Sequence, residues 1–517
     1  MPAKVTRAVA CALALMVCSL LLVIARGAAD APATSDTAVI ESYVRMAGDG
    51  QLLVGAYSRY QWHHPGPLYF YLLAPLYRLG GARTAALNAG ASVLSLASLS
   101  FIVWVCCRRR PALAVPACAV LSLFAWRAGE ALASPWNPHV PVLALVALMV
   151  AAADVIAGGA WSMPVTAVLA SLSGQAHVAL MPVSLIAAAA AFARTVVGAA
   201  GADGRAWRRS LLATAAALAA CWALPFYEQF RATPTGNITE LSRFFLHRTT
   251  TGQSLAVAVS AWSDMFIGVL RPDFYVAHGW PFVESPVLWA EWTALLVLGA
   301  LALSVARSAR RRDVFTLALS ALLVACAAVG LWSATRIEDR IFDHDLFWLS
   351  GLGALAIAVS LDAVMAGLMN PSAWRAAARV AVLAGAVVMT TAAVTQVRRA
   401  VALSRQPSDD AVRARALAED LRRYLDARRL RRPFVTIDQD SWGVVAGALL
   451  DLQKHGRLVS VEEDWVVMFT PLYRRTGAED AVIHIAMPDE HARLQARGLP
   501  VIASHGPIWA HVEALSE

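Results

Sequence analysis

Long apolar runs separated by short charged segments dominate the chain between residues 8 and 395. Most runs approach the roughly 20 residues that a helix needs to cross a bilayer. The pattern predicts about eleven membrane-spanning helices, from the runs at residues 8–25, 84–107, 111–126, 140–157, 161–193 (two helices), 210–226, 287–306, 314–333, 346–366 and 376–395. The predicted fold class is therefore an all-α polytopic membrane bundle.

The run at 161–193 is too long for one span and too short for two full ones. A polar break, Gly174 to His177, lies in its middle. Two short helices place the arginines at 194–209 on the same side as Arg108–Arg110, which the positive-inside rule favours. We therefore expect two helices here, with the N-terminus in the cytoplasm and the C-terminus outside.

Three segments then face outward: a first external loop at 30–79, a loop at 127–139, and a long external loop at 228–285. The first apolar run is either an uncleaved helix or a signal peptide cleaved near residue 29, and both alternatives leave 30–79 outside. Within that loop, the Tyr-rich run at 68–77 is too short to span. It is typical of a helix lying in the membrane interface.

The tail has a different pattern, with charged residues throughout. Residues 408–427 predict an amphipathic helix with Leu417, Leu421 and Leu425 on one face. Four strand-like runs follow (434–437, 458–461, 481–485 and 500–503), alternating with helical patterns at 441–455 and 488–497. We therefore divide the chain into a transmembrane domain, 1–396, and a small soluble α/β domain on the outer face, 397–517.

Composition agrees with a membrane protein, since 58% of residues are hydrophobic and the mean hydropathy is +0.55. The net charge of +8 comes from arginines beside apolar runs, which indicates cytoplasmic loops and no nucleic-acid partner. All seven cysteines lie in apolar runs without metal-ligand spacing, so no disulfide framework is expected.

Candidate chemistry concentrates in the first external loop. Asp36 heads a short amphipathic helical pattern, where it is equally well interpreted as a helix N-cap or as a catalytic base. Arg59 and the pair His63–His64, in the turn His-His-Pro-Gly-Pro, follow it. The simple alternative for the histidines is a turn in the headgroup layer.

Further candidates lie in the later loops and at the helix break. Glu130 is the only acid of its loop, and Gln175 and His177 are polar groups inside an apolar run. Such groups face a cavity or tie two helices together. Arg243 and Arg248, set among aromatics, suit a phosphate or extend to lipid headgroups. Two Asp-x-Asp spacings, at 343–345 and 438–440, leave a divalent metal ion open, although solvated loop acids explain both.

Taken together, Asp36 in a long first loop, a His-Pro-x-Pro turn before an interfacial aromatic run, and a helix ending in Arg108–Arg110 resemble the GT-C membrane glycosyltransferases. The nearest types are the protein O-mannosyltransferases and the lipid A aminoarabinose transferases. The resemblance implies that Asp36 is the catalytic base and that Glu130 supports the acceptor site.

By the same resemblance, the donor is a polyprenyl-phosphate-linked sugar, and the acceptor is a glycan, lipid or protein of the bacterial cell envelope. The family's lysine at the helix break is replaced here by Gln175-Ala176-His177. The donor phosphate is therefore expected to contact His177, with Gln175, His63 and His64, and the arginines Arg59, Arg243 and Arg248. No cofactor is expected beyond the metal ion left open.

Two other classes of protein fit the same pattern. A transporter or flippase of a lipid-linked glycan also carries buried polar groups, but it usually has internal symmetry, which we do not find. A non-catalytic envelope assembly protein, whose tail binds a partner, is the third. The expected location in all three cases is the inner membrane, with membrane lipids as partners.

Overall fold

The computed structural model describes residues 3–30, 32–201, 204–232, 235–247, 251–272, 274, 288–338, 340–365 and 368–513. The chain forms two compact units. Unit 1 comprises Met1–Gly90 and Val397–Glu517, and unit 2 comprises Ala91–Gln396. The division into domains at residues 396 and 397 stays a prediction.

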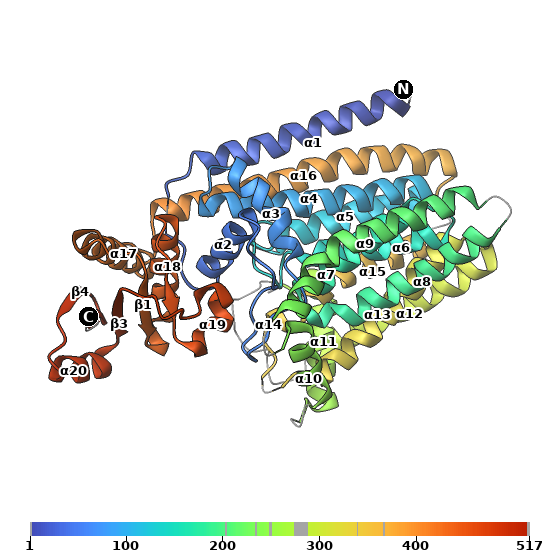
Figure 1. Cartoon of the computed structure of the whole chain (residues 1–517). Helices are drawn as coiled ribbons and strands as arrows, with labels where there is room; N and C mark the ends of the chain where they lie inside the picture. The colour runs from blue at the N-terminus through green and yellow to red at the C-terminus, as the bar shows by residue number, and fades with distance from the viewer. Residues whose placement is uncertain are drawn as a thin grey trace. The chain divides into compact units, whose positions relative to one another are not determined.

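Unit 2 is a bundle of helices that run roughly along a common direction (Figure 1). Its elements are the greater part of α4 (Thr84–Arg109), α5 (Pro111–Arg127), α6 (Pro141–Ile156), α7 (Ser162–Ala176), η1 (Val178–Leu180), α8 (Met181–Ala200), α9 (Arg205–Arg231), α10 (Asn237–Leu246), α11 (Leu255–Phe266), η2 (Gly268–Leu270), α12 (Leu288–Arg311), α13 (Val314–Thr335), α14 (Asp343–Leu346), α15 (Trp348–Met365) and most of α16 (Pro371–Arg405).

The centre of the bundle is α6, which is buried from Pro141 to Val155 and packs against α7, α8, α13 and α15. A helix that is apolar on every side is stable only when other helices surround it. On α15, a Cβ at Gly353 would collide with the backbone of Phe266, so glycine lets α11 approach closely. The burial of α11 among α12, α13 and α15 was not predicted from the sequence.

Seven helices in the described part of the chain are long and apolar enough to cross a membrane, and four apolar helices are shorter. Helices occur at all the runs predicted to span, including α1 (Ala3–Arg26). The predicted break is confirmed, because α7 ends at Ala176 and α8 begins at Met181. The chain is a multi-pass membrane protein, and the number of spans stays a prediction.

Arginines and buried acids pair at one end of this bundle. Arg108 and Arg109 bind Asp154, which has no exposed side-chain surface; the Arg108 contact is 2.7 Å. Arg110 binds Asp362 at 2.8 Å and Asp313 at 3.1 Å. The buried acids of α6 and α15 therefore neutralise the predicted cytoplasmic arginines.

Unit 1 joins the first loop to the C-terminal residues. The loop contributes α2 (Ser35–Gly48) and α3 (Leu68–Leu79). The C-terminal part contains α17 (Asp409–Arg428), β1 (Pro433–Ile437), η3 (Gln439–Ser441), α18 (Trp442–Lys454), β2 (Ser460–Val461), α19 (Glu463–Phe469), η4 (Pro471–Tyr473), β3 (Ala481–Ala486), α20 (Pro488–Ala496), β4 (Val501–His505) and β5 (Ile508–Glu513). The predicted α/β fold of the tail is confirmed.

The sheet has the order β2-β1-β3-β5-β4. Strand β1 is parallel to β2 and β3, while β5 pairs antiparallel with β3 and β4. The predicted leucine face of α17 is buried, and α17 packs on α18. Helix α18 also packs on α2 (Figure 1). Gly447 permits close approach of α18 to the carbonyl of Ala33, just before α2.

Candidate functional site

Asp36 lies in the first turn of α2, not at its N-cap. The N-cap is Thr34, whose backbone is extended and whose side chain makes no capping hydrogen bond. An acid in the first turn still interacts favourably with the helix dipole. The half-buried carboxylate of Asp36 accepts a hydrogen bond from the hydroxyl of Tyr57. The N-cap alternative for this residue is therefore wrong.

Tyr57 reaches Asp36 because residues 56–64 form a small hairpin. Tyr57 bridges His63, Ser58 N donates to Trp62 O at 2.8 Å, and His64 N donates to Ala56 O at 2.7 Å. Burial first, and then the Asp36 carboxylate, raises the pKa of Tyr57. The phenol therefore stays protonated and acts as a donor to Asp36. No sequence pattern indicated Tyr57 as the partner of Asp36.

The two histidines of the hairpin are buried and do not lie in an exposed turn. His63 is 8% exposed. Burial lowers its pKa to about 4, and a hydrogen bond with the backbone of Val467 in α19 partly offsets this shift. His64 is also buried, edge-on to Trp62 at 5.3 Å between ring centroids. Arg59 is exposed at the hairpin tip, where its Nη2 donates to the Tyr60 hydroxyl at 2.9 Å. Their predicted phosphate contacts stay predictions.

A second acid of α2, Glu41, was missed by sequence analysis. Its carboxylate is fully buried and pairs with Lys454 of α18 at 2.6 Å. The hydroxyls of Tyr77 and Thr84 donate to its two oxygens at 2.7 and 2.6 Å. A buried carboxylate needs such a full set of partners. Glu41, five positions after Asp36 in α2, therefore holds α2 against α18 of the C-terminal part.

Other polar side chains of α2 also reach the C-terminal residues. Ser42 donates to Gln453 at 2.9 Å and lies 3.2 Å from the hydroxyl of Tyr473. Tyr43 donates to the carbonyl of Met468 at 2.7 Å. In the adjoining helix α3, the Tyr69 hydroxyl is buried without a hydrogen-bond partner among the described residues. Burial first, then Tyr43 and Asp36, raises its pKa, so this hydroxyl is also a protonated donor near Asp36.

In unit 2, Gln175 lies in the last turn of α7 and is fully buried. Its Nε2 donates to the backbone carbonyl of Cys221 in α9 at 2.8 Å. Asn137 Nδ2 donates to the carbonyl of Ala176 at 3.4 Å. This hydrogen bond between α7 and α9 is the contact expected if Gln175 ties two helices together. Its predicted part in donor binding stays a prediction.

His177 follows in an extended conformation, and His344 lies near it. Burial lowers its pKa to about 4, and His344 of α14 adds to the shift. The ring of Trp136 lies 5.0 Å from that of His344 and 5.2 Å from that of His139. We call His139, His177, His344 and Trp136 the imidazole cluster. Only His177 of these was predicted, because the cluster is assembled from three segments that are far apart in sequence.

Of the remaining predicted residues, Glu130 and Arg243 lie on separate, exposed elements. Glu130 is exposed in the turn after α5. Arg243 of α10 pairs with Glu240 at 3.2 Å on an exposed surface. Arg248 lies outside the described residues. Asp343 and Asp345 flank His344 at 3.7 Å. No group of three or more His, Cys, Asp or Glu in the described ranges is arranged to hold a metal ion.

Comparisons with known proteins give one result. No protein-family model and no curated protein sequence matches the chain. Among solved structures, ArnT from Cupriavidus metallidurans bound to undecaprenyl phosphate matches over 99% of both chains, with 15% identity and a TM-score of 0.52. ArnT in the apo state matches over 99% of this chain and 98% of its own, with 14% identity and a TM-score of 0.54.

The archaeal oligosaccharyltransferase AglB from Archaeoglobus fulgidus is a weaker match, at 13% identity and a TM-score of 0.41 over 91% of this chain and 69% of its own. The match to ArnT covers the bundle and the C-terminal residues alike. The predicted resemblance to the GT-C glycosyltransferases is therefore confirmed at the level of the fold.

Proposed function

We propose that this chain is a membrane glycosyltransferase that moves a sugar from a polyprenyl-phosphate donor to a cell-envelope acceptor. The observation that carries the proposal is the fold shared along the whole chain with ArnT, which was solved with undecaprenyl phosphate bound. Reaction on the outer face of the bacterial inner membrane is part of the proposal. It follows from the arginine-rich segments assigned to the cytoplasm.

In the proposed reaction, Asp36 is the base. The acceptor hydroxyl attacks the anomeric carbon while the bond from that carbon to the phosphate oxygen breaks. The proton passes to Asp36, and the lipid phosphate leaves with the bonding electron pair. Tyr57 supports this role because its hydrogen bond fixes the carboxylate. The buried Tyr69 hydroxyl is a second donor beside the base, suited to a sugar hydroxyl.

We assign the leaving phosphate to the imidazole cluster and to the predicted arginines, Arg59, Arg243 and Arg248. With a pKa of about 4, His177 is neutral near pH 7 and donates a hydrogen bond, not a charge. The arginines then supply the positive charge that the growing phosphate charge requires. Glu130 stays the proposed second acid of the acceptor site.

The test uses purified protein in lipid nanodiscs with a polyprenyl-phosphate sugar and envelope extracts as acceptors. We expect Asp36→Asn to fold and insert but to lower turnover by roughly a hundredfold or more. The matched control is Asp49→Asn, an acid at the end of the same helix whose side chain is 56% exposed. It should retain near-normal turnover.

Two outcomes separate the alternatives. Near-normal transfer by well-folded Asp36→Asn protein would remove Asp36 from the mechanism. A flippase would form no glycosidic product in the purified reaction, yet would still change the envelope glycans seen by mass spectrometry of cells with and without the protein.

A further inference from the structure

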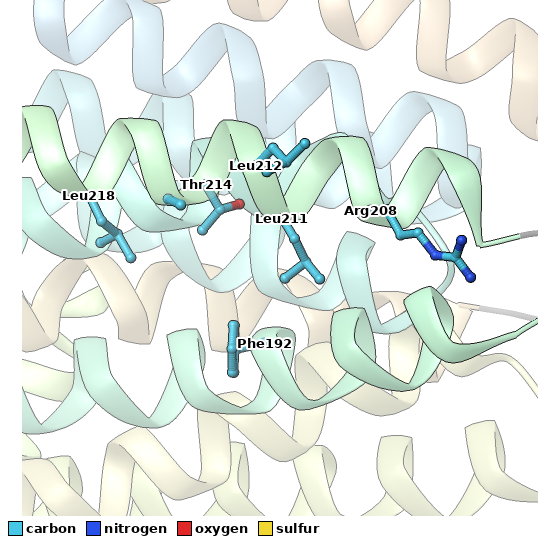
Figure 2. A pocket seen from close by; sticks show the side chains of 7 residues that line it. Phe192, Arg208, Leu211, Leu212, Thr214 and Leu218 are labelled. Carbon is cyan, nitrogen blue, oxygen red and sulfur yellow. The ribbon is translucent and has the colours of Figure 1, made fainter.

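A groove of about 540 Å³ runs along the surface of unit 2 between α8 and α9 (Figure 2). Phe192 of α8 forms one wall. The other wall is α9, with Leu211, Leu212, Ala215 and Leu218, and Arg208 lies at one end of the row. Phe192 and Leu212 are 49% and 73% exposed. The groove therefore opens toward the lipid and not into the bundle.

The groove has the length of one membrane leaflet. Its α9 residues recur at intervals of three and four, which puts them in one stripe along the helix. From Arg208 to Leu218 the stripe extends about 15 Å, at 1.5 Å per residue. That is about half of the roughly 30 Å hydrocarbon core. The small side chain of Ala215 leaves space at the middle of the stripe, so an acyl chain can lie along it.

Positive charge gathers at the Arg208 end. Arg208 Nε donates to the carbonyl of Ala199 at 3.1 Å, which holds the guanidinium beside the C-terminal end of α8. Arg205 and Arg209 are its neighbours on α9, and both are exposed. Arg194 of α8 stacks on Trp207 at 4.6 Å. Basic pockets between membrane helices on the cytoplasmic side suit anionic headgroups.

We propose that this groove binds one anionic phospholipid. An acyl chain lies along the α9 stripe opposite Phe192, and the headgroup phosphate contacts Arg208. The match in length favours a diacyl phospholipid of one leaflet, because a polyprenyl tail is far longer than the groove. The site lies on the predicted cytoplasmic side and is independent of the proposed reaction. A bound lipid would stabilise α8, which follows the helix break at His177 and the short helix η1.

The test uses the full chain in nanodiscs and in mild detergent. Native mass spectrometry should find one retained phosphatidylglycerol per chain in preference to phosphatidylcholine. Thermal unfolding should shift upward by a few degrees when phosphatidylglycerol replaces phosphatidylcholine, since a ligand of the folded state stabilises it. Arg208→Gln should weaken retention at least tenfold, and Arg208→Lys should restore part of it.

Arg231→Gln is the matched control, because Arg231 is exposed at the other end of α9 and does not line the groove. Ala215→Trp, at an exposed position, should fill the groove and displace the lipid without loss of fold. Equal retention by the wild-type chain and Arg208→Gln would overturn the proposal. Displacement of the phospholipid by equimolar polyprenyl phosphate would also overturn it, because the groove would then bind a polyprenyl chain. So would a dimer that Ala215→Trp dissociates, because the groove would then bind a second copy of this chain.

Discussion

At the scale of single residues, Asp36 illustrates what a sequence position leaves open. Its place before an amphipathic pattern fits a cap as well as a base, and the cap in fact belongs to Thr34. Its partner, Tyr57, comes from a hairpin whose short backbone ladder has no distinctive sequence pattern. The candidate acid was predictable from the sequence, and the group that orients it was not.

Replacing Tyr57 tests this orientation. Tyr57→Phe removes the donor to Asp36, and a hydrogen bond to a charged group contributes about 1.5–3 kcal/mol. We expect kcat to fall about tenfold or more with little change in the donor KM. The acid limb of the pH–rate profile should move to higher pH, because the carboxylate loses a stabilising donor. Tyr60→Phe, at the hairpin tip, is the control.

The lowered pKa of the buried His63 side chain predicts that the stability of the fold depends on pH. Its pKa is about 4 in the folded chain and about 6.5 when unfolded, so the unfolded chain binds more protons between these values. Stability is therefore full above pH 6.5 and falls as the pH drops to 4, by about 3 kcal/mol at most. Thermal unfolding of His63→Gln should lose this part of the pH dependence. Parallel curves for both proteins would contradict a buried neutral His63.

At the scale of elements, the side chains that hold α2 against α18 come from distant parts of the sequence, so no local pattern identifies them. Glu41 lies in an amphipathic stretch and Lys454 at the end of a helix 413 positions later, so only the tertiary structure pairs them. The sequence did predict four strands and three helices of the tail. It missed β5 and α19, because a seven-residue helix spans only about two turns, too few for a repeating pattern, and His511 interrupts the apolar pattern of β5.

Breaking this pair should loosen α2. Lys454→Met leaves the buried Glu41 carboxylate without its cation, which costs on the order of 3 kcal/mol. Glu41→Gln combined with Lys454→Met should cost less than the sum of the single changes, because the isolated charge is gone. The surface control is Arg78→Met, which breaks an exposed pair with Asp49 and should cost about 1 kcal/mol or less. Additive losses in thermal unfolding would exclude the coupling.

At the scale of the whole molecule, hydropathy predicted the bundle well because bilayer thickness sets helix length. The break at Gly174–His177 followed from arginine parity and is present. The short helix α11 was missed, since twelve residues in a segment rich in charged and aromatic neighbours give no spanning signal. The imidazole cluster was only partly predictable, because three distant segments supply it.

The predicted orientation is testable by thiol labelling of intact cells. A membrane-impermeant reagent should label Thr251→Cys and Gln406→Cys, which are exposed and assigned to the outer side. It should miss Ala309→Cys, beside the arginines at the end of α12, until the cells are permeabilised. Labelling of Ala309→Cys in intact cells would invert the topology and place Asp36 in the cytoplasm.

The Glu41–Lys454 contact has a spectroscopic consequence. The sequence contains two lysines, Lys4 and Lys454. Reductive methylation with ¹³C formaldehyde would therefore label two side chains and the terminal amine, in a chain of 517 residues. The dimethylammonium resonance of Lys454, 16% exposed and ion-paired, should stand apart from the other two. Its chemical shift would follow the docking of α18 on α2 as donor or acceptor is added.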